Sequence, residues 1–219
     1  MEPLLWIPIV IGILLGANII VYLVQRYVYH KTVPTTIGGI SSYIFNWGTL
    51  LFWPFMEITR PFWVRRKWLE KAGVQEGQVC LEEGFGFGTS PILAARMVGK
   101  TGRVYALENA LVAVANLWAR AKIRRSKNLS LILSDASDTG LQDGSVDIVF
   151  INDAFHEFPD KEGTLKELYR VLKTDGLLSI KEDTERKAVK VVELIAAGDL
   201  FSLIERDKTF CKFKKPGVG

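Results

Sequence analysis

The arrangement of hydrophobic and polar residues divides the chain into an apolar N-terminal stretch and a longer alternating region. From Gln78 onward, short runs rich in Val, Ile and Leu alternate with helical patterns, which is typical of a parallel sheet covered by helices on both faces. The predicted strands are 79–83, 103–108, 129–134, 146–151, 177–182, 201–206 and 209–214. The predicted helices are 91–98, 111–125, 161–172 and 186–197.

The last two predicted strands are separated only by Asp207 and Lys208. No crossover helix fits into two residues, so these strands must pair antiparallel. The pattern therefore predicts an α/β fold with a doubly wound, mostly parallel seven-stranded sheet that ends in an antiparallel hairpin. This ending differs from the common nicotinamide-binding arrangement.

The N-terminal stretch contains a run from Leu4 to Val24 without any charged residue. A helix of about 20 apolar residues is long enough to cross a bilayer. A cleaved signal peptide would carry positive charge before the run, whereas here Arg26 and Lys31 follow it. We therefore expect a retained transmembrane anchor in residues 1–30, with the rest of the chain on the cytoplasmic side of the membrane.

Residues 31–72 are expected to form an interfacial, amphipathic linker before the folded domain of residues 73–219. Its first part is uncharged and aromatic but broken by Gly and Pro, so it fits a segment at the headgroup level, a second span, or a lid on the domain. The part from Pro61 to Lys71 mixes aromatic and basic side chains and suits an anionic membrane surface. It also suits an ordinary first helix packed on the sheet with a solvated basic face.

Charge and cysteine content narrow the function classes. Residues 1–72 hold seven Lys and Arg against three Asp and Glu, whereas residues 73–219 hold 21 of each sign. A nucleic-acid enzyme would more often carry its basic excess on the folded domain, so we expect no nucleic-acid partner. Cys80 and Cys211 fall within predicted strands without a His or Cys at ligand spacing, which predicts buried free thiols and no metal site.

The clearest motif is a run of alternate glycines directly after the first predicted strand. Glu82 and Glu83 end the strand, and Gly84, Gly86 and Gly88 follow. Ser90 and Pro91 then suit the cap and first position of a helix. This strand–turn–helix unit is typical of nucleotide binding, but its glycine spacing differs from the nicotinamide fingerprint. The loop carries acidic and no basic residues, which favours a cationic ligand over a polyphosphate.

Further candidate residues follow the other predicted strands, because ligands of doubly wound sheets bind beyond the carboxyl ends of the strands. Glu108 ends the second strand and has two acceptor oxygens for the hydroxyls of a ribose, or else caps the next helix. Asp135 and Ala136 suit an adenine, although they also fit a plain polar turn. Asn152, Asp153 and His156 follow the fourth strand.

Residues 79–183 resemble the Rossmann-like S-adenosylmethionine-dependent methyltransferases of the small-molecule or lipid type. The resemblance is carried by Glu82-x-Gly84-x-Gly86-x-Gly88, the strand ending at Glu108, Asp135-Ala136, residues 146–152 with Phe155-His156-Glu157, and residues 170–176. Three positions depart from the family pattern: Glu82 replaces the more usual Asp, Glu157 replaces a second His, and Lys173 to Gly176 replace Lys-Pro-Gly-Gly.

The resemblance implies S-adenosylmethionine as cofactor. It places the methionine part at Glu82 and the three glycines, the ribose at Glu108, the adenine at Asp135 and Ala136, and the transferred methyl near Asn152. Asp153 and His156 are candidates for a general base, and His156 alternatively shapes the pocket wall. The expected acceptor is lipid-soluble or membrane-embedded: a phospholipid amine, a prenyl quinone or a membrane protein. A membrane-bound NAD(P)-dependent oxidoreductase and a non-catalytic adaptor are the alternatives.

Overall fold

The computed structural model describes residues 54–55, 57–58 and 62–216. The chain divides into two compact units, residues 1–48 and 49–219, and all described residues belong to the second. The predicted anchor, residues 1–30, and the first half of the linker therefore lie outside the described residues. Among the residues that are described, no helix is long and apolar enough to cross a bilayer.

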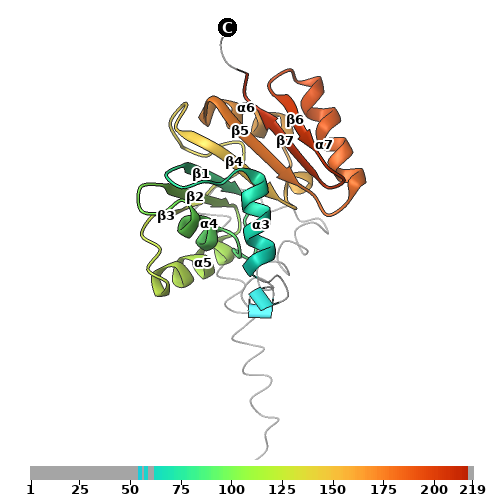
Figure 1. Cartoon of the computed structure of the whole chain (residues 1–219). Helices are drawn as coiled ribbons and strands as arrows, with labels where there is room; N and C mark the ends of the chain where they lie inside the picture. Colours follow the sequence, from blue (N-terminus) through green and yellow to red (C-terminus); the bar gives the residue numbers. More distant parts are fainter. Residues whose placement is uncertain (1–53, 56, 59–61, 217–219) are drawn as a thin grey trace, which may run out of the picture. The chain divides into compact units, whose positions relative to one another are not determined.

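Thirteen elements follow one another from residue 62 onward, and Figure 1 labels the α-helices and strands among them. They are α3 (Phe62–Ala72), β1 (Val79–Glu83), α4 (Pro91–Met97), β2 (Arg103–Glu108), α5 (Leu111–Ile123), β3 (Leu129–Leu133), β4 (Val146–Asn152), the short 3₁₀ helix η2 (Phe155–Glu157), α6 (Lys161–Val171), β5 (Leu172–Lys181), α7 (Glu185–Ala197), β6 (Ser202–Arg206) and β7 (Phe210–Lys214).

The strands form one seven-stranded sheet in the order β3-β2-β1-β4-β5-β7-β6. Strands β1 to β5 pair in parallel, whereas β7 runs antiparallel to both β5 and β6. The predicted sheet and its closing hairpin are thus confirmed. The hairpin follows from the short turn at Asp207, whose backbone N–H donates to the carbonyl oxygen of Phe210.

Helices cover both faces of the sheet, because successive side chains of a strand point to opposite faces and the central strands β1 and β4 bury both sets. On one face, Cys80, Ile148 and Phe150 pack against α3 and α4, and α5 packs beside α4. On the other face, Leu81 and Val149 belong to the core cluster that contains the buried side chains of α6 and α7. Figure 1 shows α3 and α4 lying against the same face.

Two local expectations differ from the structure. β5 begins at Leu172, so Lys173 to Gly176 form an irregular part of this strand and not a separate turn. Val146 of β4 pairs with Leu172 of β5, and the next pair is Ile148 with Leu177. β5 thus uses five residues where β4 uses two, and Asp175 in this bulge has a φ of +64°. Ser90 occupies the cap position of α4 without a capping hydrogen bond, because its hydroxyl bonds to Glu82 instead.

Both cysteines are buried free thiols, as predicted. Burial raises the pKa of Cys80 to about 12 and also raises the pKa of Cys211. The Cys211 thiol contacts the carbonyl oxygen of Ala188 in α7. The two side chains therefore serve as small apolar groups on opposite faces of the sheet.

One core position carries an acid that is poorly suited to its surroundings. Glu83 at the end of β1 is fully buried, and neither carboxyl oxygen has a hydrogen-bond partner among the described residues. Burial raises the pKa of this carboxyl well above its usual range, and the nearby Glu167 and Asp135 add to the rise. The folded chain therefore keeps a proton on Glu83 at pH values where the unfolded chain has lost it.

We expect Glu83→Leu to stabilise the protein at pH 8 by about 1–3 kcal/mol, because an apolar side chain of similar volume replaces a buried acid. With its pKa raised in the folded state, Glu83 lowers the free energy of unfolding progressively as pH rises above the ordinary glutamate value. The gain from Glu83→Leu should therefore be larger at pH 8 than at pH 5, as measured by urea unfolding. The exposed Glu193→Leu is the control, and a destabilised Glu83→Leu variant would contradict the interpretation.

Candidate functional site

The carboxyl ends of the parallel strands lie along one edge of the sheet. On this edge, the strand order reverses between β1 and β4. β1 pairs with β2 on one side and with β4 on the other. The loops that follow β1 and β4 therefore depart toward opposite faces, and a crevice opens between them. The chain's candidate ligand-binding residues belong to the loops and strand ends of this edge.

A cleft with about 250 Å³ of empty space, open to solvent, lies beside this edge. It brings together four residues that the sequence predicts to bind the cofactor: Gly84 after β1, Glu108 at the end of β2, and Asp135 and Ala136 after β3. The remaining lining residues are Leu107, Asn109, Ser134, Phe158 and Pro159. Phe158 and Pro159 form an apolar wall that the sequence analysis did not predict.

Glu108 connects the second strand to the glycine loop. Its Oε2 accepts from the backbone N–H of Gly86 at 3.0 Å, and its Oε1 accepts from the N–H groups of Asn109 at 3.0 Å and Ala110 at 3.3 Å. The side chain is 8% exposed. Burial raises the pKa of Glu108, while these N–H donors oppose the rise. The carboxylate thus supports the start of α5 and also lines the cleft, so the two interpretations of Glu108 are compatible.

The glycine loop is held close to the loop that follows β4. Gly84, Gly86 and Gly88 all have φ between +50° and +66°, a region that other residues rarely adopt. A Cβ on Gly84 would come within 2.6 Å of the Cβ of Ala154. Gly84 is therefore required both by its backbone conformation and by the close approach of the two loops. Gly88 in turn packs against α5, next to Leu117.

Two guanidinium groups support the glycine loop from behind. Arg120 of α5 donates to the carbonyl oxygen of Phe87 at 2.6 Å, and Arg65 of α3 donates to that of Thr89 at 2.6 Å. Desolvation lowers the pKa of Arg120 to about 10. The loop itself carries no basic residue, and its sequence does not predict these contacts, which join residues 24 and 33 positions apart.

Glu57 compensates these charges. Both of its carboxylate oxygens accept from Arg124, at 3.1 and 2.9 Å, and Oε1 lies 3.8 Å from Arg65 and 3.7 Å from Arg120. Glu57, which precedes α3 in the chain, is thereby connected through these arginines to the loop that lines the cleft. No sequence signal identified Glu57 as a partner of α5.

Glu82 and Glu83 lie in the sheet and do not line the cleft. Burial raises the pKa of both carboxyl groups well above the usual range, although the hydrogen bond from Ser90 partly opposes the rise at Glu82. The acidic residues that do line the cleft are Glu108 and Asp135. Any preference of this site for a cationic ligand therefore comes from these two residues more than from the end of β1.

The candidate residues after β4 form a second group toward β5. The side-chain oxygen of Asn152 accepts from Lys181 at 3.4 Å. Asp153 has a φ of +58° and its Oδ1 accepts from the N–H of Asp183 at 3.1 Å. The Nδ1 of His156 lies 2.7 Å from Glu182 Oε2. Glu182 was not predicted as a site residue, although it ends the predicted strand 177–182.

Comparison with known proteins agrees with this geometry. A family model described as "Methyltransferase domain" matches residues 81–180, from β1 into β5. The demethylmenaquinone methyltransferase of Lactobacillus johnsonii is 33% identical over 123 residues, covering 55% of this chain and 50% of that protein. That of Staphylococcus aureus is 28% identical over 154 residues, covering 69% of this chain and 62% of that protein. The matched region thus spans about half to three-fifths of these relatives.

The similarity extends to a solved structure of the same class. An S-adenosylmethionine-dependent methyltransferase from Aquifex aeolicus superposes with a TM-score of 0.60 and 26% sequence identity, covering 69% of this chain and 88% of that protein. The glycine loop and the acidic end of β2 lie within the matched region, and the strands that make up the sheet lie within or beside it. Residues 81–180 therefore match a methyltransferase domain, and the fold around them is that of the Rossmann-like S-adenosylmethionine-dependent methyltransferases.

Proposed function

We propose that this protein transfers the methyl group of S-adenosylmethionine to a lipid-soluble or membrane-embedded acceptor. The observation that carries the proposal is the cleft, which gathers Gly84, Glu108 and Asp135 from the ends of three neighbouring strands. Their chemistry suits a nucleoside with a cationic sulfur, because carboxylates accept hydrogen bonds and attract positive charge.

The residues of the cleft fit the parts of this cofactor. The carboxylate of Glu108 has acceptor capacity for ribose hydroxyls, and Asp135 suits the exocyclic amine of an adenine. Gly84 leaves its side of the cleft free of a side chain. The cofactor, when bound, supplies an already activated methyl group. The protein's own contribution is then to align the acceptor and exclude water, for which Phe158 and Pro159 offer an apolar wall.

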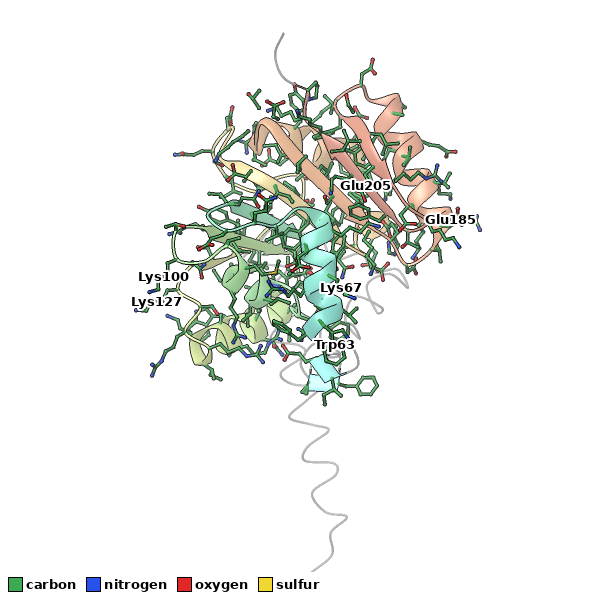
Figure 2. All side chains as sticks on the ribbon, in the orientation of Figure 1. Trp63, Lys67, Lys100, Lys127, Glu185 and Glu205 are labelled. Atoms are coloured by element: carbon green, nitrogen blue, oxygen red, sulfur yellow. The ribbon has the colours of Figure 1, made fainter. Side chains whose placement is uncertain are left out.

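The first turn of α3 supports an acceptor in the membrane, whereas its second half packs on the domain. Trp68, Leu69 and Ala72 are buried against the sheet, as expected of an ordinary first helix. The first turn instead exposes Phe62, Trp63 and Val64, which are 46%, 65% and 51% exposed. Figure 2 shows Trp63 and Lys67 on this helix. Exposed aromatic and basic side chains near a long apolar segment favour contact with an anionic lipid surface.

The names of the relatives add support for a lipid-soluble acceptor. Both are called demethylmenaquinone methyltransferases, a name that supports a prenyl quinone as one acceptor class in this proposal. A phospholipid amine and a membrane protein side chain remain the other classes. The oxidoreductase alternative loses support, because the sheet ends in the antiparallel hairpin and the glycine spacing is not that of the nicotinamide fingerprint.

A direct test uses the purified full chain, S-adenosylmethionine labelled in its methyl group, and vesicles made from a total lipid extract. We expect cofactor binding in calorimetry and incorporation of label into the lipid fraction. Glu108→Ala should weaken binding by about 10- to 100-fold, as expected for the loss of hydrogen bonds to a charged acceptor. Absence of both binding and transfer in the wild type would overturn the proposal.

Glu205→Ala is the control for Glu108→Ala, because Glu205 is an exposed residue of the edge strand β6 (Figure 2). Glu108 also accepts from the N–H of Ala110 at the start of α5. Circular dichroism should therefore accompany the binding measurement. Binding without transfer, by a folded wild type, would favour the adaptor alternative.

The role of Gly84 can be separated from its backbone conformation. Gly84 and Gly140 both have a φ of +66°, but a Cβ would meet Ala154 at Gly84 and nothing within 4 Å at Gly140. We expect Gly84→Ala and Gly140→Ala each to lose about 1–2 kcal/mol of stability from the backbone conformation. Only Gly84→Ala should also weaken cofactor binding in calorimetry. Equal binding by the two variants would show that the glycine loop does not shape the site.

The predicted anchor can be tested on membranes. The full chain should remain in the membrane pellet after extraction with alkaline carbonate, whereas a variant lacking residues 4–24 should be released. Replacing the same residues by a leucine run of equal length should restore retention, because about 20 apolar residues suffice to span the bilayer. Retention of the deletion variant would contradict an anchor at this position.

A further inference from the structure

A second group of charged residues lies at the same edge of the sheet, beside the cofactor cleft. We call His156, Glu182 and Lys187 the His156 cluster; they come from η2, the residue that follows β5, and the first turn of α7. Glu182 Oε2 lies 2.7 Å from His156 Nδ1, and Glu182 Oε1 accepts from the backbone N–H of His156 at 3.2 Å. Glu182 therefore fixes both the ring and the backbone of His156.

The contacts of Lys187 determine which ring nitrogen carries the proton. Lys187 Nζ lies 3.0 Å from His156 Nε2 and 2.8 Å from Asp183 Oδ2. The hydrogen bond to Asp183 raises the pKa of Lys187, so the amine stays an ammonium group, which can only donate. Nε2 must then accept, and Nδ1 donates to Glu182 where that carboxyl group is ionised; burial raises the pKa of Glu182, and its contact with His156 opposes the rise. Nε2 thus keeps the lone pair of a base.

The position of the cluster suits a group that meets the methyl acceptor. The cofactor cleft lies over the ends of β1, β2 and β3, and the His156 cluster lies over β4 and β5. Between them, Ala154 lies next to Gly84, and Phe158 lines the cleft two residues after His156. An acceptor that approaches the methyl group from the side of β5 would therefore meet the His156 ring.

Carboxyl groups make up most of the charged surroundings of the His156 ring. Glu182 is only 1% exposed and contacts the ring directly. Glu157 lies 3.8 Å from Nε2, and Asp153 and Asp183 act on the cluster electrostatically. Four carboxyl groups thus oppose the single ammonium of Lys187. The side chain of Lys187 is long and partly exposed, and its ammonium group also pairs with Asp183. It can therefore leave the His156 ring and keep this partner.

The same residues invite comparison with a cation site. Asp153, His156 and Glu182 offer oxygen and nitrogen atoms that all lie within 4.8 Å of one another. However, His156 and Glu182 already satisfy each other, and the ammonium of Lys187 lies against the ring. A nearby positive charge disfavours a divalent cation. The geometry is that of a proton site, and metal dependence is kept as an outcome of the test.

We propose that His156 Nε2 takes a proton from the methyl acceptor, that Glu182 is its positioning residue, and that Lys187 covers Nε2 until the acceptor arrives. This inference rests on the proposed function. The acceptor atom bonds to the methyl carbon, and the carbon–sulfur bond breaks with its electron pair left on sulfur. The acceptor's proton moves to Nε2 and then to water. The substrate class is therefore an acceptor that loses a proton, such as a hydroxyl or an activated ring carbon, and not a tertiary amine or thioether.

The proton position can be measured without any substrate. The chain contains two histidines, His30 and His156, so a His156→Asn variant assigns the imidazole signals in ¹⁵N NMR of the full chain. We expect the wild-type His156 ring to carry its proton on Nδ1 at pH 8 and an unprotonated Nε2. A ring protonated on Nε2 would overturn the proposal.

Kinetics then distinguish a role in proton transfer from a structural one. Transfer of label from S-adenosylmethionine into total-lipid vesicles is measured from pH 5 to 9. His156→Gln should lower kcat by about 10²- to 10⁴-fold, as is typical for the loss of a general base. Glu182→Gln should lower kcat by about tenfold or more and move the acid-side decline of activity to lower pH, by about one unit, because a negative charge beside the ring is lost.

Lys187→Met should move the same decline to higher pH, because a positive charge is lost. Opposite shifts from the two variants, with unchanged cofactor affinity in calorimetry, are not expected of a merely structural cluster. The exposed Glu193→Gln and Lys190→Met on α7 are the matched controls. If the wild type transfers label and both Glu182→Gln and Lys187→Met keep the wild-type pH profile, this inference fails while the proposed function stands.

Two further outcomes are also decisive. Loss of transfer on treatment with EDTA and its recovery with Mn²⁺ would overturn the proton-acceptor role in favour of a metal. A wild type that binds no cofactor and transfers no label would remove the proposed function, and this inference with it. In that case an Nδ1-protonated ring would still establish the geometry of the cluster, but without an acceptor.

Discussion

The candidate site depends on one constraint: β1 is hydrogen-bonded along both of its edges by parallel neighbours. With β2 on one side of β1 and β4 on the other, the loops that follow β1 and β4 must leave toward opposite faces of the sheet. Neither loop can then close the space beyond β1. The glycine loop enters this space and meets the β4 loop at Ala154. Glu108 then holds the glycine loop through the N–H of Gly86. The cleft is therefore a product of strand order before it is a product of particular side chains.

Much of this arrangement could be predicted because it depends on local sequence. Short runs rich in Val, Ile and Leu, separated by helical patterns, predicted the strands of the sheet, and the two-residue turn at Asp207 predicted the antiparallel end. Glu108 and Asp135 could be selected because the ends of parallel strands meet at one edge. The same rule, applied to the fifth strand, would have added Glu182. Glu182 was missed because the rule was applied only to the first four strands.

The remaining contacts could not be predicted from the sequence, because they join residues that only the packed helices bring together. Arg120 reaches Phe87 from α5, and Glu57 reaches Arg124 across 67 positions. Nothing in a helical pattern distinguishes these side chains from solvated charges. Their effect is considerable, since they connect the segment before α3 to the loop beside the cofactor cleft. A change in how that segment is held would be transmitted to the glycine loop by contact alone.

The buried thiols have a practical consequence. A cysteine reacts as its thiolate, and burial in the sheet keeps both Cys80 and Cys211 protonated and covered. Cys80 and Cys211 should thus not react with maleimide reagents while the chain is folded. A single cysteine placed on any exposed loop would then report its own surroundings without first removing the native residues. If the proposed anchor holds the chain in a vesicle, reagent access from either side would test the orientation of the chain.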